Sequence, residues 1–391
     1  MGSRVCEELP RKIHQQNLQA VLALTGGASG AIAALLQTPG ASRTILEAVV
    51  PYSARALSQW IGSSPEQFCS RTTALAMAMR AYARAADLHN QTAEADLAEI
   101  MGVAATASLA TDRPKRGAHR LHVAIQTLAA TTTWSVNFDK GKRTRGEEET
   151  LAADLVLLAI AMGAGIETAA ARSELEHRLA AHEVVEFENV QADPAWQQLL
   201  AGKQQIAILN GAAPVRAVLP GSFNPVHDGH LAMAAYAEQR LGVPVAWELS
   251  IANVDKPALD YMTISHRLES LQRRAPQRSL ALTNAATFRE KASLLPQTTF
   301  VVGADTIERI DAPRYYASVS DRDRAVAHLA AHGCHFLVFG RLQEDRFVTL
   351  ENLALSSGLR DLCESVNAHE FRQDVSSTAL RRAQQAMEEG S

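Results

Sequence analysis

Two histidines, His227 and His230, lie three residues apart and bracket Gly229. They follow a short apolar run, residues 215–219, and precede an apolar pattern typical of a helix. At the start of a helix, free backbone N–H groups and the helix dipole attract anions. Two imidazoles that donate hydrogen bonds there would stabilise a polyphosphate whose negative charge grows in the transition state. A pair with this spacing could also bind a metal ion or cap the helix, so the pair alone leaves three interpretations open.

The loop before the histidines has residues that suit a phosphate site. Gly221 lets the chain turn and lets a ligand approach the backbone closely. The whole stretch reads Gly221-Ser222-Phe223-Asn224-Pro225-Val226-His227-Asp228-Gly229-His230. It resembles the GxFxPxHxGH signature of the nucleotidylyltransferase superfamily at every fixed position. The resemblance implies catalytic roles for the two histidines and nucleotide binding by Gly221, Ser222, Phe223 and Asn224.

A second motif near the C-terminus, residues 375–381, resembles the superfamily's ISSTxxR signature. Ser376 or Ser377 can cap the helix that follows, and hydroxyl and N–H groups at a helix start form an anion cradle. Arg381 lies one turn further on and could bind phosphate oxygens through its planar fork. A plain helix cap is the alternative. Beside the histidine motif, the resemblance favours phosphate binding by Ser376, Ser377 and Thr378, with Arg381 as a third catalytic residue.

A third element is the turn that ends in Asp305, directly after a predicted strand at residues 298–302. Superfamily members have a similar turn near the nucleotide ribose, so the resemblance implies that Asp305 accepts a hydrogen bond from a ribose hydroxyl. A helix N-cap at Asp305 is an equal alternative. Four further residues could reach phosphate, but a solvated surface position is favoured for each: Lys256, His266, Arg267 and Lys291.

The resemblance implies in-line attack by a substrate phosphate on the α-phosphorus of a nucleoside triphosphate, with release of pyrophosphate. Mg²⁺ would arrive on the triphosphate, and no metal site of the protein's own is expected. The SST form of the C-terminal motif resembles the nicotinamide mononucleotide adenylyltransferases more than the cytidylyltransferases, which favours ATP and a mononucleotide as substrates. Another phosphorylated acceptor, transfer from CTP, and a nucleotide-binding regulator without turnover are the alternatives.

The second half must position these groups, and it alternates short apolar runs with helical patterns. Strands are expected at residues 215–219, 245–251, 298–302 and 336–339, with a helix at residues 231–241. Such alternation predicts a Rossmann-like, doubly wound parallel sheet. Ligands bind beyond the carboxyl ends of the strands in such sheets, which is where the histidine loop is expected.

The first half is rich in alanine and contains a glycine-rich turn, residues 25–30, between a predicted strand and a helix. This turn could cradle a phosphate, although a simple tight turn is commoner. With Tyr52 and Ser53, it resembles the C-terminal domain of the competence/damage-inducible family, an α/β domain that deamidates nicotinamide mononucleotide. The family's nucleophilic serine is replaced by Ala23 and its lysine by Leu57. Because alanine has no atom that can attack an amide, we expect hydrolysis to be lost. Residual deamidation is an alternative, and the domain could bind a nucleotide, form homo-oligomers or regulate its neighbour.

The predicted organisation is two α/β domains, residues 1–170 and 213–391, with a linker at 171–212. The 38 Lys and Arg against 42 Asp and Glu argue against a nucleic-acid or membrane-surface partner. Four scattered cysteines predict a reducing, cytoplasmic environment. Residues 13–42 carry no charged side chain, but the glycine-rich turn interrupts them, so a buried strand, turn and helix are expected rather than a membrane span.

Overall fold

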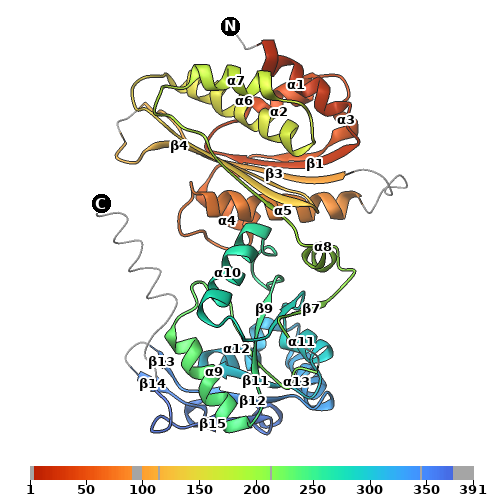
Figure 1. Ribbon diagram of the computed structural model, residues 1–391, viewed down its shortest axis with the longest axis vertical. Helices are drawn as coiled ribbons and strands as arrows, with labels where there is room; N and C mark the ends of the chain where they lie inside the picture. Colours follow the sequence, from red (N-terminus) through yellow and green to blue (C-terminus); the bar gives the residue numbers. More distant parts are fainter. Residues whose placement is uncertain (1–3, 90–98, 113–114, 212–213, 344–345, 373–391) are drawn as a thin grey trace. The chain divides into compact units, whose positions relative to one another are not determined.

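The computed structural model describes residues 4–89, 99–112, 115–211, 214–343 and 346–372 (Figure 1). The chain divides into two compact units. The first unit contains Met1–Gln197 and Asp255–Met262, and the second contains Gln198–Val254 and Thr263–Ser391. The sequence predicts two domains, residues 1–170 and 213–391, joined by a linker at 171–212. A division into compact units does not test whether these pieces fold separately, so the bounds stay a prediction.

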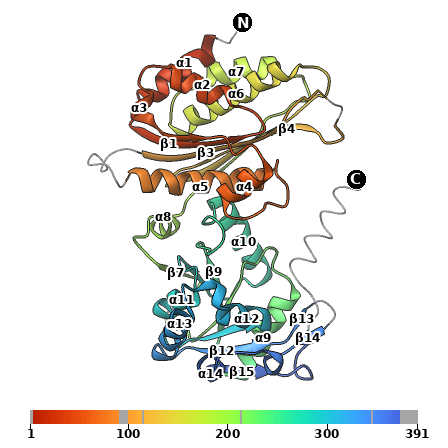
Figure 2. The same ribbon diagram turned by 180° about the vertical axis from the view of Figure 1, so that it is seen from behind.

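The first unit is built on one six-stranded sheet with helices on both faces (Figure 1). In spatial order its strands are β2 (Ile45–Val49), β1 (Leu18–Thr25), β3 (Glu99–Ser108), β4 (His119–Gln126), β5 (Ala130–Phe138) and β6 (Glu186–Gln191). The first three are parallel and the others antiparallel. One face carries α1 (Arg4–His14), α2 (Gly30–Gln37), α3 (Ala41–Thr44), α6 (Arg145–Gly163) and α7 (Ala169–Arg178), and the other carries α4 (Ala54–Ile61) and α5 (Arg71–His89) (Figure 2).

Side chains of β1 alternate between these two faces, as the pleat of a strand requires. Leu22 and Leu24 pack in the core that contains α6. Ala23, between them, packs with Leu57 of α4 and Met77 of α5. All three residues of β1 are fully buried, so the strand is covered on both sides.

The start of α6 shows how a local signal sets an element. Thr144 accepts a hydrogen bond from the Glu147 backbone N–H, and the Glu147 carboxylate accepts from the Thr144 N–H at 2.7 Å. This capping box satisfies two N–H groups that a helix start leaves without partners. The helix therefore begins at Arg145, ahead of its mostly apolar stretch at residues 151–162.

The second unit contains a seven-stranded sheet that confirms the predicted doubly wound fold. In spatial order its strands are β15 (Cys363–Val366), β12 (His335–Phe339), β11 (Thr299–Gly303), β8 (Ala217–Pro220), β9 (Val245–Ser250), β10 (Leu280–Thr283) and β7 (Ile206–Leu209). All are parallel except β7, which runs antiparallel to β10. The chain winds outward from β8 through β9 and β10, then from β11 through β12 and β15. The winding direction therefore reverses between β8 and β11, where doubly wound sheets bind ligands.

The other elements of this half are short helices and a hairpin. They are α8 (Pro194–Leu200), α9 (Asp228–Leu241), α10 (Tyr261–Arg274), α11 (Phe288–Leu294), α12 (Ala304–Asp311), α13 (Val319–Ala331), α14 (Ser357–Arg360), the 3-10 turns Pro313–Tyr315 and Leu350–Asn352, and the hairpin of β13 (Arg341–Gln343) and β14 (Arg346–Val348). The helix α9 ends at Gly242, whose φ of 67° suits the left-handed conformation that closes a helix. Within the part of the chain that is described, no helix is long and apolar enough to span a membrane.

Candidate active site

Three neighbouring strands of the second sheet end at the same edge, and each is followed by a polar group of interest. The loop 221–227 follows β8, Asp305 follows β11, and Arg341 follows β12 after one glycine. Because β8, β11 and β12 are adjacent and parallel, their carboxyl ends lie together. The fold thus brings the histidine loop and the Asp305 turn to one edge, as the sequence predicts.

The buried ring of Phe223 holds the histidine loop in place. Its side chain is 1% exposed, and its φ of 46° turns the chain sharply. The ring packs edge-on against Trp247 of β9 at 5.1 Å and against His230 at 5.2 Å between ring centroids. A Cβ on Gly221 would lie 2.8 Å from the Phe223 ring, which is too close. Glycine is therefore required at position 221 for the phenylalanine to hold the loop.

His227 is the most unusual group in the loop. It precedes the first residue of α9 and is only 5% exposed. Neither of its ring nitrogens has a hydrogen-bond partner within the described part of the chain. Buried polar atoms are almost always hydrogen-bonded, and one without a partner costs free energy. The ring nitrogens therefore have hydrogen-bonding capacity that a bound ligand can use.

His230 is held against His227 by two contacts. The rings stack with centroids 3.8 Å apart and planes at 26°, and the His227 backbone N–H donates to His230 Nδ1 at 3.2 Å. Because Nδ1 accepts this bond, the proton of the neutral ring lies on Nε2. Nε2 then carries the N–H group through which His230 can donate a hydrogen bond.

Both imidazoles are uncharged at neutral pH. Burial, and then the neighbouring His227 and Arg341, depress the pKa of His230 to about 3. Burial and then Arg341 also lower the pKa of His227, against the opposing effect of Asp228. The histidines can therefore donate hydrogen bonds to a phosphate but do not supply positive charge.

Two arginines that the sequence analysis missed, Arg341 and Arg274, place positive charge near the histidine loop. Arg341 Nε lies 3.7 Å from Asp305 Oδ1, and Arg274 forms an ion pair with Asp228, the residue after His227. Arg341 follows a predicted buried strand after a single glycine, and that position is a usable signal for a residue at the ligand-binding edge. Arg274 is the last residue of α10 and carries no comparable signal.

Asp305 does not cap its helix. The N-cap of α12 is Gly303, and Asp305 lies within the first turn, so the N-cap alternative is wrong. Its carboxylate lies close to Gly303, where a Cβ would be 2.5 Å from Oδ1. The side chain is 47% exposed, which leaves it accessible, and a contact with a ribose stays a prediction.

The remaining predicted residues are placed as follows. Ser222 and Asn224 are exposed in the loop after β8, and Lys256 is exposed in the segment that belongs to the first unit. Ser376, Ser377, Thr378 and Arg381 lie outside the described residues. Their roles stay predictions.

Lys291 corrects an expectation, because it is not on the solvated surface. It is 5% exposed, and its Nζ lies 2.5 and 2.6 Å from the two carboxylate oxygens of Glu248, which is itself fully buried. Thr283 donates to the same carboxylate at 2.5 Å. The apolar neighbours on β9 and α11 bury the charges, and each charge then needs the other as a partner.

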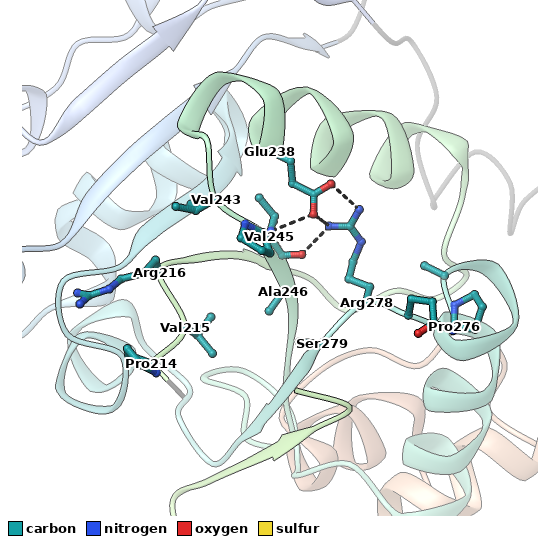
Figure 3. Close-up of a pocket in the computed structure, with 13 residues that line it drawn as sticks. Pro214, Val215, Arg216, Glu238, Val243, Val245, Ala246, Pro276, Arg278 and Ser279 are labelled. Carbon is teal, nitrogen blue, oxygen red and sulfur yellow. Dashed lines mark hydrogen bonds and ion pairs between the residues drawn. The ribbon is translucent and has the colours of Figure 1, made fainter. Parts of the chain in front are cut away.

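A cavity of about 590 Å³ lies at the opposite edge of this sheet, at the amino ends of β8 and β9 (Figure 3). Arg278 and Glu238 point toward one another in its wall, with the two guanidinium nitrogens 2.6 and 3.1 Å from the carboxylate oxygens. This cavity is separate from the histidine loop and does not enter the predicted site.

In the first unit, the glycine-rich turn already holds an anion from its own chain. Glu149 of α6 accepts hydrogen bonds from the Ala28 N–H at 2.9 Å, the Ser29 hydroxyl at 2.9 Å and the Gly30 N–H at 3.3 Å. Ala23, in place of the nucleophile, is fully buried. The groups that could have cradled a phosphate therefore bind a carboxylate of the same chain.

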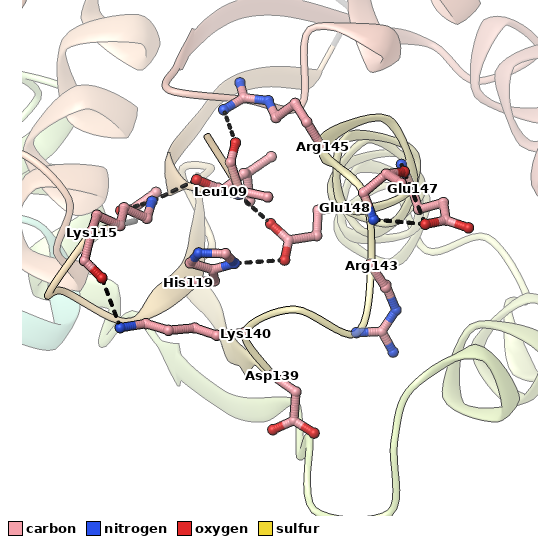
Figure 4. A network of polar contacts seen from close by, with 12 residues as sticks. Leu109, Lys115, His119, Asp139, Lys140, Arg143, Arg145, Glu147 and Glu148 are labelled. Atoms are coloured by element: carbon pink, nitrogen blue, oxygen red, sulfur yellow. Dashed lines mark hydrogen bonds and ion pairs between the residues drawn. The ribbon is translucent and has the colours of Figure 1, made fainter. Parts of the chain in front are cut away.

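A second polar network near this turn is also internally satisfied (Figure 4). His119 Nδ1 lies 2.7 Å from Glu148 Oε1, and the other oxygen of Glu148 accepts from the Ala110 N–H at 2.6 Å. His119 is 6% exposed and Glu148 is fully buried. The network connects β4 to α6, and His119 Nδ1 and both carboxylate oxygens of Glu148 have partners within it.

Comparison with known proteins identifies the second half. Residues 218–383 match the family model described as cytidylyltransferase-like. These residues form a cytidylyltransferase-like domain. The matched range contains the histidine loop, Asp305, Arg341 and the motif at 375–381. The cytidylyltransferase-like domain supports nucleotidyl transfer as the class of activity.

The N-terminal region resembles solved structures of competence/damage-inducible proteins. The protein from Agrobacterium tumefaciens is 19% identical, with 42% of this chain and 98% of that chain covered and a TM-score of 0.33. The protein from Enterobacter asburiae is 16% identical, with 41% and 99% covered and a TM-score of 0.33. A related protein from Escherichia coli is 17% identical, with 40% and 87% covered and a TM-score of 0.31. Among curated proteins, none matches the chain.

Proposed function

We propose that this chain transfers the adenylyl group of ATP to nicotinamide mononucleotide and releases pyrophosphate. The observation that carries the proposal is the buried imidazole of His227 at the start of α9, whose ring nitrogens have no hydrogen-bond partner among the described residues. It lies where the winding of the sheet reverses, in a domain of the cytidylyltransferase-like family. The choice of ATP and this mononucleotide rests on the resemblance of residues 375–381 to the adenylyltransferase signature.

In the proposed reaction, a phosphate oxygen of the mononucleotide attacks the α-phosphorus of ATP. The bond from the α-phosphorus to the bridging oxygen breaks, and pyrophosphate leaves with the electron pair. The N–H groups of His227 and His230 donate to the phosphate oxygens as negative charge shifts onto the leaving group. No protein nucleophile takes part, so the residues act by positioning and by stabilising charge.

The two arginines supply the charge that the neutral histidines lack. Arg341 and Arg274 are each paired with a carboxylate and each lowers the pKa of His227. A triphosphate carries more negative charge than one carboxylate, so it competes for both guanidinium groups. We expect Arg341 to bind the triphosphate, with Arg274 orienting the start of α9 through Asp228.

The described residues hold no cluster of three or more His, Cys, Asp or Glu side chains that fits a metal ion. A magnesium ion that arrives on the triphosphate would be held by the triphosphate oxygens and would neutralise charge on the leaving group. The chain's own residues bind the phosphate oxygens that the ion leaves free.

The test is an assay for pyrophosphate release with the full chain, in which ATP or CTP is combined with nicotinamide mononucleotide, phosphopantetheine or a phosphorylated alcohol. The proposal expects the highest kcat/KM for ATP with nicotinamide mononucleotide. Preference for another pair would overturn the substrate assignment and keep nucleotidyl transfer. ATP binding by calorimetry without turnover on any acceptor would make the chain a nucleotide-binding regulator instead.

A further inference from the structure

The cavity at the amino ends of β8 and β9 has the size and the lining of a small-molecule site (Figure 3). Its volume of about 590 Å³ falls within the range of about 300–1,000 Å³ that ligand pockets occupy. Most of its wall is apolar and includes Val215, Val243, Pro244, Val245 and Pro276. All the residues that line it belong to the second unit. An occupant of this cavity therefore needs an apolar body.

The charged side chains of the lining are two arginines and one glutamate. Arg278 pairs with Glu238 and also donates to the Val245 carbonyl at 2.5 Å. Arg278 Nε is buried and has no hydrogen-bond partner within the described part of the chain. Arg216 is exposed, and it donates to the uncharged side chain of Gln297 at 2.7 Å. The lining thus carries one more positive than negative charge, which complements a ligand with a single anionic group.

Two aromatic rings connect Arg278 to the histidine loop. The guanidinium lies over the Trp247 ring, 5.0 Å from its centroid. Trp247 packs edge-on against Phe223 at 5.1 Å, and Phe223 packs against His230 at 5.2 Å between centroids. Trp247 is 1% exposed, and its Nε1 has no hydrogen-bond partner among the described residues. Packing therefore sets the orientation of the indole, and a movement of Arg278 changes the surface against which Phe223 rests.

Glu238 gives a second connection, because it belongs to α9, the helix that starts directly after His227. Its carboxylate accepts from the Val245 N–H at 3.0 Å and from Arg278 at 2.6 Å. A guanidinium fork binds a carboxylate through two parallel hydrogen bonds, so a carboxylate ligand on Arg278 competes with Glu238. Displacement of Glu238 removes one of the contacts that hold α9 to the start of β9.

We propose that this cavity is a regulatory site for a small organic anion, with an apolar body and one carboxylate, whose binding weakens nucleotide binding at the histidine loop. The carboxylate binds Arg278 in place of Glu238, and Trp247 and Phe223 transmit the change. The proposal rests on the proposed function only in taking the histidine loop as the nucleotide site. Coupling between two sites typically changes affinity by about 5- to 150-fold, and ATP must weaken binding of the anion by the same factor.

The first experiment measures the binding of phenylbutyrate to the full chain by calorimetry, with its uncharged amide as the matched probe. We expect the carboxylate to bind at least about 5-fold more tightly, because a hydrogen bond to a charged group contributes more than a neutral one. Val243→Trp fills the cavity and should abolish binding, whereas Val319→Trp, at a 54% exposed position on α13, should not. Absence of binding, equal affinity for the two probes, or binding that survives in Val243→Trp would overturn the proposal.

Arg216→Gln is the second variant and serves if Val243→Trp fails to fold. It removes the excess positive charge at an exposed position and leaves Arg278 and Glu238 in place. The Kd for phenylbutyrate should rise by about 2- to 5-fold, as loss of an exposed ionic contact does, and the Kd for the amide should not change. Arg324→Gln, on the exposed surface of α13, is the control. An unchanged Kd for phenylbutyrate would overturn the assignment of an anion to this cavity.

The second experiment tests the coupling. Saturating phenylbutyrate should raise the Kd for ATP by about 5-fold or more in the wild type, and acetate at the same concentration should not. An unchanged Kd, or an equal rise with acetate, would overturn the regulatory role.

The ring signals of His227 and His230 in NMR spectra give a readout that needs neither ATP nor turnover. Phenylbutyrate should shift these signals in the wild type and in Val319→Trp but not in Val243→Trp, and equal shifts in both variants would contradict the coupling. If the wild type shows the shifts but releases no pyrophosphate, the proposed function fails while the regulatory site stands.

Discussion

Each unit has a glycine-containing turn between a parallel strand and a helix. The two turns differ in whether a side chain of the same protein forms hydrogen bonds with their polar groups. The turn after β1 points two N–H groups and a hydroxyl at Glu149, a residue 120 positions away from Ser29. The loop after β8 ends in His227, whose ring nitrogens are buried without partners in the described chain. Both β1 and β8 lie between two parallel neighbours, so the backbone setting is alike.

The difference separates a structural turn from a binding loop. A strand, glycine turn and helix start point N–H groups toward an anion wherever they occur. When a carboxylate of the same chain occupies that position, the groups stabilise the fold. When buried polar groups at that position have no partner in the protein, they destabilise the fold, and a bound ligand can supply the missing hydrogen bonds.

The largest expected effect concerns the histidine loop after β8. His230→Ala should lower kcat for pyrophosphate release by about 10²–10³-fold, as loss of one donor to a developing charge does. His369→Ala, an exposed histidine of the same unit, is the control and should leave kcat unchanged. Wild-type turnover in His230→Ala would show that the histidine only packs against Phe223 and His227.

The second effect concerns the charge beside this loop. Arg341→Gln should raise the KM for ATP by about 10-fold or more, because a hydrogen bond to a charged group contributes about 1.5–3 kcal/mol. Arg324→Gln, a 65% exposed arginine on α13, is the matched control. An unchanged KM would mean that Arg341 serves only its ion pair with Asp305.

In the glycine-rich turn after β1, we expect a substitution to change only the free energy of unfolding. Glu149→Ala leaves the Ala28 and Gly30 N–H groups and the Ser29 hydroxyl without their acceptor, which should cost about 1–3 kcal/mol in the free energy of unfolding. Urea unfolding measures this, with the exposed Glu176→Ala as control. Pyrophosphate release at saturating ATP should not change, and a large loss of turnover would contradict the view of this turn as structural.

The pH dependence of stability should also distinguish the loops. The folded-state pKa of His230 is depressed to about 3 from an ordinary 6.5, so below pH 6.5 the unfolded chain binds a proton that the folded chain does not. The free energy of unfolding should therefore fall between pH 6.5 and 3, by at most about 1.4 kcal/mol per pH unit. His230→Gln cannot titrate and should show a shallower slope in urea unfolding at pH 7, 6 and 5. Parallel slopes would refute the buried neutral state.

The smallest expected effect is none at all. Ala23→Ser should not restore release of ammonia from nicotinamide mononucleotide, because position 57 is also apolar and the serine would be buried against Met262. The wild type is the control in the same assay. Ammonia above the wild-type background would show that the first unit still binds the mononucleotide.

The sequence was sufficient where the signal is local. The helix after the histidine loop and the alternation of strands and helices follow from residue types over short spans, and the doubly wound sheet confirms the predicted fold. Asp305 and Lys291 show the limit. Whether Asp305 caps its helix depends on a shift of two residues in the helix start, and whether Lys291 is solvated depends on Glu248, 43 positions away.

The sequence by itself determined which groups could do chemistry: two histidines at a helix start, and an alanine where a nucleophile would be. Only the tertiary structure decided which polar groups are already satisfied, because Glu149, Arg341 and Arg274 reach their partners across distances in sequence that no local pattern records. The placement of Asp255–Met262 in the first unit is of the same kind. Burial and pairing are properties of the packed chain, and they determine whether a given motif binds a ligand or stabilises the fold.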